Sequence, residues 1–279
     1  MKPSATGGGP GAVPAGSARE AAVAEAAART AGAVIRKGFA RPARIAHKGR
    51  VDIVTEVDLA AEREILKIVG AAFPDDGIVT EEAGVREGRG DRCWLVDPLD
   101  GTTNFAHGYP QCSVSVALVD RDGPALGVVY DPLRDELFRA VRGAGAVLNG
   151  APLAVTGVSL LEEALLATGF PYELSHRAAA LALAGSFLPR IMGLRRDGSA
   201  ALDLAWVAAG RLDGYWEFSI RAWDIAAGSL LVEEAGGRVS GFRGEKLDLD
   251  KRTIVAANPV LHARLAEVIA GSGFCLPPY

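Results

Sequence analysis

The stretch that most constrains this chain is residues 94–105, which read W-L-V-D-P-L-D-G-T-T-N-F. It opens with an apolar run, W-L-V, that is typical of the end of a buried strand. This strand would present Asp97 at its tip, and because Pro98 has no N–H to donate to a ladder, we expect the strand to end there. Asp100 follows, and Gly101 permits a sharp turn into two threonines and an asparagine.

Two carboxylates three residues apart on a bend can point into one small volume. Their mutual repulsion favours a cation between them, and carboxylate and turn carbonyl oxygens suit a hard ion such as Mg²⁺. Aspartate, proline and glycine are also ordinary turn residues, so a solvated turn is the better explanation of this motif when it is taken alone. Other residues of the sequence are needed to distinguish a metal site from a solvated turn.

Composition narrows the classes of protein that this chain can belong to. Its 279 residues, 49% hydrophobic and 23% charged, can build one large domain or two lobes around a substantial core. A net charge of −4 argues against a nucleic-acid partner, which normally requires a basic surface. Three scattered cysteines form neither a zinc motif nor a disulfide framework, so we expect a reducing, cytoplasmic location. We find neither a secretory signal nor a membrane-length apolar run.

The chain is expected to change character along its length. Glycine, proline, alanine and serine dominate residues 1–17, which predicts a flexible tail. Residues 18–150 predict two helices followed by mostly sequential strands, with a tight turn at Asn149 and Gly150. Residues 151–279 alternate helices and strands, as in an α/β lobe. We predict helices at 18–39, 57–73, 176–189, 201–210, 223–235 and 260–270, and strands at 78–79, 94–96, 113–118, 125–130, 136–141, 146–148, 165–168, 214–218 and 253–257.

Further acidic residues stand at the ends of predicted elements. Glu81 follows a short strand, and Asp224 opens a predicted helix in W-D-I-A-A-G. A helix N-terminus favours an anion, and aspartate is also a good capping residue. Capping alone would therefore explain Asp224, and it would explain Asp58 at the start of the second helix in the same way.

Together, these stretches resemble the inositol monophosphatase family of magnesium-dependent, lithium-sensitive phosphatases. The resemblance covers the chain from residue 18 to its C-terminus and implies an α/β (α+β) fold, a layered αβαβα sandwich of the sugar-phosphatase type. Two long signatures in the right order with a glutamate pair upstream make chance improbable. The matching stretches are E-E-A-G at 81–84, D-P-L-D-G-T-T-N-F at 97–105, G-S-A-A-L-D-L at 198–204, Y-W-E at 215–217 and W-D-I-A-A-G-S-L-L-V-E-E-A-G-G at 223–237.

The resemblance implies two to three Mg²⁺ ions. Glu81, Asp97 and the carbonyl of Leu99 would hold the first ion, and Asp97, Asp100 and Asp224 the second. A third, looser ion would lie near Glu81, mostly on waters. In this reading lobe 18–150 carries most metal ligands, whereas lobe 151–279 carries substrate contacts and one ligand.

The resemblance also assigns the catalytic and substrate-binding residues. Thr102 would orient the attacking water, Asp58 would accept the threonine proton, and Glu81 would act through its metal. Threonine alone is a poor base, so the pair is needed. The residues implied to contact the substrate are Asp100, Gly101, Thr102, Ser199, Ala200, Glu217 and Asp224.

The sequence leaves the identity of the substrate and the roles of several side chains undetermined. Glu217 favours a polyol, above all myo-inositol 1-phosphate, while related families act on fructose 1,6-bisphosphate, histidinol phosphate or nucleotide 3′-phosphates. Lys48 is either a loop lysine that closes over the metals or a solvated side chain. Arg195 and Arg196 could bind a phosphate or form a salt bridge, and His107 is interpreted as a packing or outer residue.

Two other classes of protein fit these residues less well, a phosphatase with an aspartate nucleophile and a scaffold without turnover. A phosphatase of the haloacid dehalogenase type needs D-x-D, but two residues, Pro98 and Leu99, separate the aspartates here. A scaffold without turnover is disfavoured because every expected catalytic residue is present. A homodimer is expected from the resemblance alone, and no membrane partner is expected.

Overall fold

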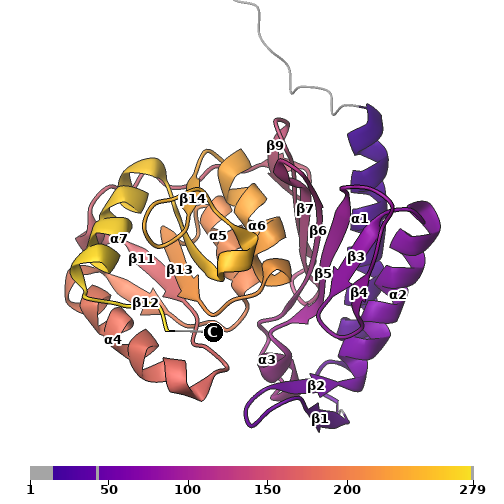
Figure 1. Cartoon of the computed structure of the whole chain (residues 1–279), viewed down its shortest axis with the longest axis horizontal. Coiled ribbons are helices and arrows are strands. Elements are labelled where there is room, and N and C mark those ends of the chain that lie inside the picture. Colours follow the sequence, from indigo (N-terminus) through magenta and orange to yellow (C-terminus); the bar gives the residue numbers. More distant parts are fainter. Residues whose placement is uncertain (1–14, 42–43, 278–279) are drawn as a thin grey trace, which may run out of the picture.

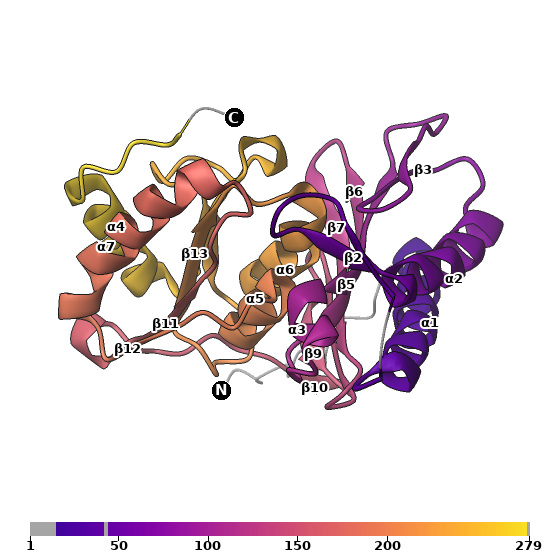
Figure 2. The ribbon, with the colours of Figure 1, turned by 90° about the horizontal axis from the view of Figure 1, so that it is seen from below.

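Five alternating layers of helices and sheets build the described part of the chain, residues 15–41 and 44–277 of a computed structural model (Figure 1). Two helices cover one face of an eight-stranded sheet, two fill the space between the sheets, and two cover the outer face of a five-stranded sheet (Figure 2). The predicted αβαβα sandwich is therefore confirmed. In layer order these helices are α1 (Ala15–Gly38), α2 (Glu56–Ala72), α5 (Ala200–Ala208), α6 (Ala222–Glu234), α4 (Arg177–Phe187) and α7 (Pro259–Gly271).

The first sheet has the order β10-β9-β8-β7-β6-β5-β3-β4. Every pair is antiparallel except β3 and β5, which run parallel. Its strands are β3 (Gly77–Thr80), β4 (Gly84–Arg86), β5 (Cys93–Asp100), β6 (Ser113–Asp120), β7 (Gly123–Asp131), β8 (Glu136–Val141), β9 (Gly145–Leu148) and β10 (Ala151–Pro152).

The second sheet has the order β12-β11-β13-β15-β14, and β11 runs parallel to both of its neighbours. Its strands are β11 (Leu165–Thr168), β12 (Gly193–Arg195), β13 (Gly214–Phe218), β14 (Arg238–Ser240) and β15 (Thr253–Ala257). The remaining elements are a small hairpin of β1 (Ile45–His47) and β2 (Ile53–Thr55), the short helix α3 (Thr102–Ala106), and 3₁₀ turns at Leu161–Glu163, Leu174–His176, Leu188–Arg190 and Leu249–Lys251.

Strand β5 shows why the central stretch reads as an unbroken apolar run. Trp94 and Val96 point to the core shared with α1 and α2, whereas Leu95 points to the core shared with α5 and α6. Because both faces of this strand are covered by helices, both sets of side chains are apolar. Packing against helices on both faces therefore fixes the position of β5, including the polar residues at its C-terminal end.

Proline 98 does not end this strand, contrary to the sequence-based expectation. Strand β5 continues to Asp100, with a register shift between Asp97, opposite Ser115, and Asp100, opposite Ser113. One extra residue in β5 makes this a β-bulge. A bulge interrupts the ladder, so the missing N–H of Pro98 costs little there.

Other expectations need smaller corrections or stay open. Helix α1 begins at Ala15, so residues 15–17 are helical and not part of a flexible tail, while residues 1–14 lie outside the described residues. The predicted turn at Asn149 and Gly150 is confirmed, because both have positive φ and β9 pairs directly with β10. The short strands β4, β12 and β14 were not predicted.

The division into lobes at residue 150 stays a prediction. The first sheet uses residues 77–152 and the second residues 165–257, but α5 and α6 pack on both sheets. None of the helices in the described ranges is both long enough and apolar enough to cross a membrane.

The contact between β7 and α6 generates a stability prediction. A Cβ atom on Gly127 would lie 2.6 Å from the Ala227 carbonyl oxygen and 2.8 Å from its Cα. Because backbone cannot yield as a side chain can, we expect Gly127→Ala to lower the free energy of unfolding by about 2 kcal/mol or more, measured by urea denaturation.

The matched control is Gly185, on the exposed face of α4, where an added Cβ meets no atom within 4 Å. Gly185→Ala should raise the free energy of unfolding by roughly 0.5–1 kcal/mol, since alanine is the better helix former. Equal stability of wild type and Gly127→Ala would contradict the described packing of these layers.

Candidate active site

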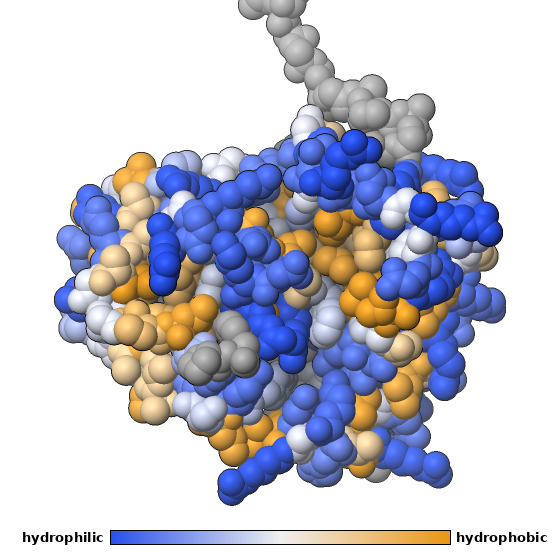
Figure 3. Space-filling view, in the orientation of Figure 1, coloured by the Kyte–Doolittle hydropathy of each residue, from blue (hydrophilic) through white to orange (hydrophobic). Residues whose placement is uncertain are grey.

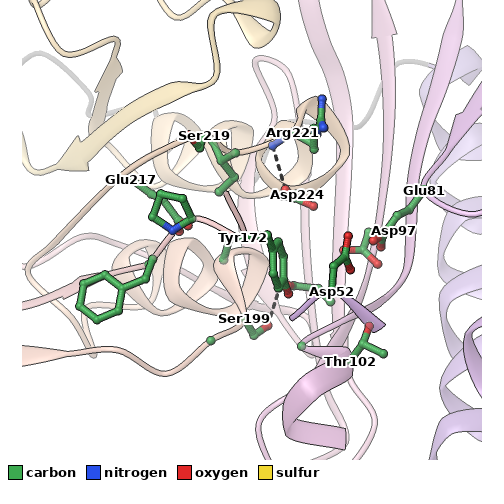
Figure 4. Close-up of a pocket in the computed structure, with 18 of the residues that line it drawn as sticks. Asp52, Glu81, Asp97, Thr102, Tyr172, Ser199, Glu217, Ser219, Arg221 and Asp224 are labelled. Carbon is green, nitrogen blue, oxygen red and sulfur yellow. Dashed lines mark hydrogen bonds between the residues drawn. The ribbon is translucent and has the colours of Figure 1, made fainter. Parts of the chain in front are cut away.

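A cavity of about 410 Å³ lies between the two sheets, within the size range of small-molecule sites. It is bounded by the β1–β2 hairpin, the carboxyl ends of β3, β5, β11 and β13, and the first residues of α3, α5 and α6. Figure 3 shows hydrophilic residues gathered along the middle of one face, between apolar patches on either side. The close-up in Figure 4 shows Glu81 and Asp97 on the first-sheet side of the cavity and Glu217 on the opposite side.

The bulge in β5 places two buried carboxyls at the floor of this cavity. Asp97 is 2% exposed, and its Oδ1 accepts a hydrogen bond from the N–H of Leu99 at 2.9 Å. Asp100 Oδ2 accepts from Ser199 Oγ at 2.6 Å and from the N–H of Ala201 at 2.8 Å. These bonds orient both carboxyls and join the end of β5 to the start of α5.

Glu81 enters the cavity from the turn after β3, opposite a lysine of the β1–β2 hairpin. Lys48 Nζ lies 2.7 Å from a carboxylate oxygen of Glu81, 2.7 Å from one of Glu82 and 3.9 Å from one of Asp52. Burial lowers the pKa of Lys48, but the glutamates outweigh it and raise that pKa above its ordinary value. This arrangement supports the closing-loop interpretation of Lys48 over the solvated one.

The fourth acid, Asp224, is the third residue of α6. Its Oδ2 accepts from the N–H of Arg221 at 2.9 Å, so the capping role expected from its position is present. The side chain also lines the cavity, and Figure 4 shows it between Glu217 on one side and Asp97 and Glu81 on the other. Capping and facing the cavity are therefore compatible at this residue.

The acids raise one another's pKa values. Burial, followed by the charges of Glu81, Asp100 and Asp224, raises the pKa of Asp97 well above its ordinary value. Burial also raises the pKa of Asp100 to about 6 and that of Asp224 well above its usual range. A cation would relieve this cost, and an all-oxygen donor set fits a hard divalent ion.

The acids are not yet gathered into a finished metal centre. Within residues 15–41 and 44–277, no three acidic, histidine or cysteine side chains stand in ready-made ligand geometry. Each of the four acids accepts a hydrogen bond from a donor of the protein itself. The all-oxygen donor set fits a hard divalent ion.

Thr102 and Asp58 form the pair that the sequence predicted. Thr102 Oγ1 lies 2.9 Å from Asp58 Oδ1 and 3.0 Å from the carbonyl oxygen of Leu99. Asp58 is fully buried, and its Oδ2 accepts from the hydroxyl and the N–H of Thr55, the N-cap of α2. Burial raises the pKa of Asp58, which these hydrogen bonds oppose.

Glu217 lies at the second-sheet end of the cavity. Its carboxylate accepts a hydrogen bond from the hydroxyl of Tyr215, and burial raises its pKa to about 7. Gly169, at the end of β11, makes room for it, since a Cβ there would lie 1.9–2.1 Å from the Glu217 carboxylate atoms. Ser199, the N-cap of α5, and Ala200, its first residue, also line the cavity.

Several residues at the site were missed or left open by the sequence. Glu62 is 3% exposed and holds the turn at Glu82 and Ala83 through their N–H groups, at 3.1 and 3.0 Å. Its position one turn after Asp58 on α2 was the available signal. His107 is exposed, with Nδ1 2.8 Å from the Thr103 carbonyl, and takes no part in the cavity.

The sequence assigned no role to Tyr172, which lies on a loop, or to Asp203 in helix α5, and it left Arg196 open. Tyr172 and Asp203 line the cavity, as does Arg196, whose guanidinium lies 5.8 Å from the centre of the Phe170 ring. Arg195 is exposed and does not line it.

This geometry can be compared with known proteins. The model of the inositol monophosphatase family matches residues 18–273. The chain belongs to this family. An inositol-1-monophosphatase of Synechocystis sp. is 45% identical over 254 residues, which cover 90% of this chain and 88% of the relative. The Nus factor SuhB of Escherichia coli is also 45% identical, over 88% of this chain and 94% of its own.

A solved structure agrees with this assignment. The inositol monophosphatase of Anabaena superposes with a TM-score of 0.84 and 38% identity, covering 94% of this chain and 98% of its own. As a member of the inositol monophosphatase family, the protein is a phosphoric monoester hydrolase.

The acidic cluster predicts how the metal-free protein responds to pH. Carboxyls whose pKa is raised by folding bind protons more tightly in the folded state than in the unfolded state, where values are near 4. Stability should therefore fall as pH rises from about 4 through the folded values, about 6 for Asp100. Asp97→Asn should reduce this loss by roughly 1 kcal/mol or more, measured by urea unfolding in EDTA between pH 5 and 8.

The control for this experiment is Asp122→Asn, which removes an exposed carboxyl far from the cavity. It should leave the wild-type pH dependence unchanged. Parallel pH profiles for wild type and Asp97→Asn would show that Asp97 carries no such electrostatic cost.

Proposed function

We propose that this phosphatase hydrolyses a small phosphorylated polyol, above all myo-inositol 1-phosphate, with two to three Mg²⁺ ions. The observation that carries the proposal is the convergence of four acids and the Thr102–Asp58 pair on one cavity. An acidic surface alone would repel a phosphate dianion. A cation held by these oxygens makes such a substrate acceptable.

The residues proposed to hold the ions are Glu81, Asp97, the Leu99 carbonyl, Asp100 and Asp224. When bound, Mg²⁺ neutralises phosphate charge and makes water more acidic. The first-sheet side of the cavity supplies every one of these groups except Asp224, which comes from α6. Helix α6 therefore joins the two halves of the site.

Proton transfer is assigned to the two buried residues behind the acids. The Thr102 hydroxyl would orient the attacking water, and its own proton can pass to Asp58 Oδ1, 2.9 Å away. Asp58 can hold that proton because burial already raises its pKa. The N–H groups of Gly101, at φ +93°, and Thr102 would cradle the phosphate at the start of α3.

The opposite end of the cavity would recognise the alcohol part of the substrate. Glu217 can accept hydrogen bonds from hydroxyls, and Ser199, Ala200 and Asp100 would contact the part nearer the ester. A polyol matches these acceptors better than an aromatic or apolar group does. Fructose 1,6-bisphosphate, histidinol phosphate and a nucleotide 3′-phosphate are the alternatives that the experiment must separate.

The first test is phosphate release from these four esters, each with Mg²⁺, with EDTA and with added Li⁺. We expect magnesium-dependent release that is fastest with inositol 1-phosphate and is inhibited by millimolar Li⁺. Asp97→Asn should lower kcat roughly 100-fold or more, because the substitution removes a shared ligand. A cooperative thermal unfolding transition of the variant at pH 5 would show that it folds.

Three outcomes would contradict this proposal in different ways. Phosphate release from another ester alone would show that the proposed substrate is wrong. Insensitivity to Li⁺ would contradict the proposed mode of ion binding. Near-normal activity of Asp97→Asn would contradict the assignment of Asp97 as a metal ligand.

Gly169 provides a test of the Glu217 end. Because a Cβ there would overlap the Glu217 carboxylate, Gly169→Ala must displace that side chain. We expect kcat/KM for inositol 1-phosphate to fall about ten-fold, mostly through KM. Gly157→Ala is the matched control, since its Cβ would meet no atom within 4 Å. Equal kinetics for both variants would show that Glu217 does not recognise the substrate.

A binding role without turnover is the second candidate, because a 45% identical relative is named a Nus factor. Such a role would not need Asp97. If Asp97→Asn replaces SuhB in Escherichia coli as well as the wild-type chain does, the binding role is supported. A homodimer, a cytoplasmic location and the absence of nucleic-acid and membrane partners remain expectations.

A further inference from the structure

One buried carboxyl at the cavity wall has no role in the mechanism above. Asp203 lies in the first turn of α5, where its N–H donates to the Ser199 carbonyl at 3.0 Å. The residue is only 1% exposed, yet it lines the cavity. Its Oδ1 has no hydrogen-bond partner among the described residues. Buried carboxyl oxygens normally have one, so this oxygen calls for an explanation.

No donor of the described residues reaches the Oδ1 of Asp203. Tyr215 and Glu217 lie two residues apart on β13, on the face that α5 covers. The Tyr215 hydroxyl already donates to Glu217. The charged groups that act on Asp203 are three acids, Asp197, Asp100 and Glu217, and one cation, Arg196.

Arg196 does not satisfy Asp203 either. Its guanidinium lies over the Phe170 ring, and it forms no ion pair within 4 Å in the described part of the chain. The indole Nε1 of Trp206, three residues later on α5, is also buried without a partner and does not reach Asp203. Because Asp203 lines the cavity, a group bound there is a candidate partner for this carboxyl.

Helix electrostatics alone is a competing explanation for Asp203. A carboxylate in the first turn of a helix is favourable without any ligand. However, Asp100 already fulfils this role at α5, since it accepts from the Ala201 N–H and the Ser199 hydroxyl. An exposed acid would serve the helix as well, without the cost of burial.

We propose that Asp203 is a second substrate-recognition carboxyl, which accepts a hydrogen bond from a substrate hydroxyl adjacent to the one bound by Glu217. The proposal rests on the proposed phosphatase function and narrows its substrate class. Two acceptors at one end of the cavity select a cyclic polyol with neighbouring hydroxyls away from the ester. A substrate that is apolar at that end leaves both carboxyls unpaired and binds less well.

The test compares Asp203→Leu and Asp203→Asn on two substrates. Inositol 1-phosphate has ring hydroxyls, whereas p-nitrophenyl phosphate has none. We expect Asp203→Leu to lower kcat/KM for inositol 1-phosphate about ten-fold or more, mainly through KM, and to leave p-nitrophenyl phosphate within about two-fold. Asparagine keeps an acceptor oxygen, so Asp203→Asn should stay within about three-fold on both.

Deoxy analogues of inositol 1-phosphate, each lacking one ring hydroxyl, identify the partner group. For the analogue that lacks the hydroxyl bound by Asp203, wild type and Asp203→Leu should have the same kcat/KM, because the interaction is already absent. The control variant Asp197→Asn removes a nearby charge from outside the cavity lining and should behave as wild type. If Asp203→Leu does not fold, the comparison of Asp203→Asn with an Asp203→Ala variant on the same analogues replaces it.

The outcomes separate this inference from the proposed function. Equal losses on both substrates, or no loss on either, would overturn the role of Asp203 and leave the phosphatase proposal intact. If the wild type prefers fructose 1,6-bisphosphate, the proposed substrate is wrong, but the same comparison on that ester still decides Asp203. Loss confined to the hydroxyl-bearing ester, with rescue by asparagine, supports the proposal.

Discussion

The structure depends on one electrostatic constraint, the confinement of Glu81, Asp97, Asp100 and Asp224 around a single cavity. Burial and mutual repulsion raise the pKa values of all four. Such a cluster is unfavourable unless a ligand compensates it. The protein tolerates the cost because each acid is tied to a local donor and because the layers on both sides bury large apolar surfaces.

The layer order explains why the acids meet at this position. Helices α5 and α6 pack on both sheets, so their N-terminal residues lie opposite the carboxyl ends of β3 and β5. Asp100 is bonded to the start of α5, and Asp224 lies in the first turn of α6. A residue of the first sheet can thus share a cavity with residues more than 100 positions later.

The two ends of the cavity have different chemistry. The first-sheet end concentrates negative charge and places the Thr102–Asp58 pair behind it, a composition suited to cations and to an attacking water. At the second-sheet end, the Glu217 carboxylate occupies space that a side chain at position 169 would fill, and it accepts a hydrogen bond from the Tyr215 hydroxyl. Asp203 belongs to this second end. The division agrees with a substrate that is anionic at one end and rich in hydroxyls at the other.

The sequence by itself determined the helix and strand types, the family and most acids of the cavity. Apolar periodicity and turn chemistry are local, so β8, β11, β13 and β15 were predicted with the bounds that the structure has. The acids could be named because they lie inside matching family stretches.

Only the tertiary structure decided how distant residues combine. The bulge that keeps Pro98 within β5 depends on pairing with β6, which no local rule reports. The contacts of Lys48 with Glu81, and the unpaired state of Asp203 beside Glu217, depend on the packing of separate elements. Hydrogen bonds and repulsion act across space, and their partners exist only once the layers are assembled.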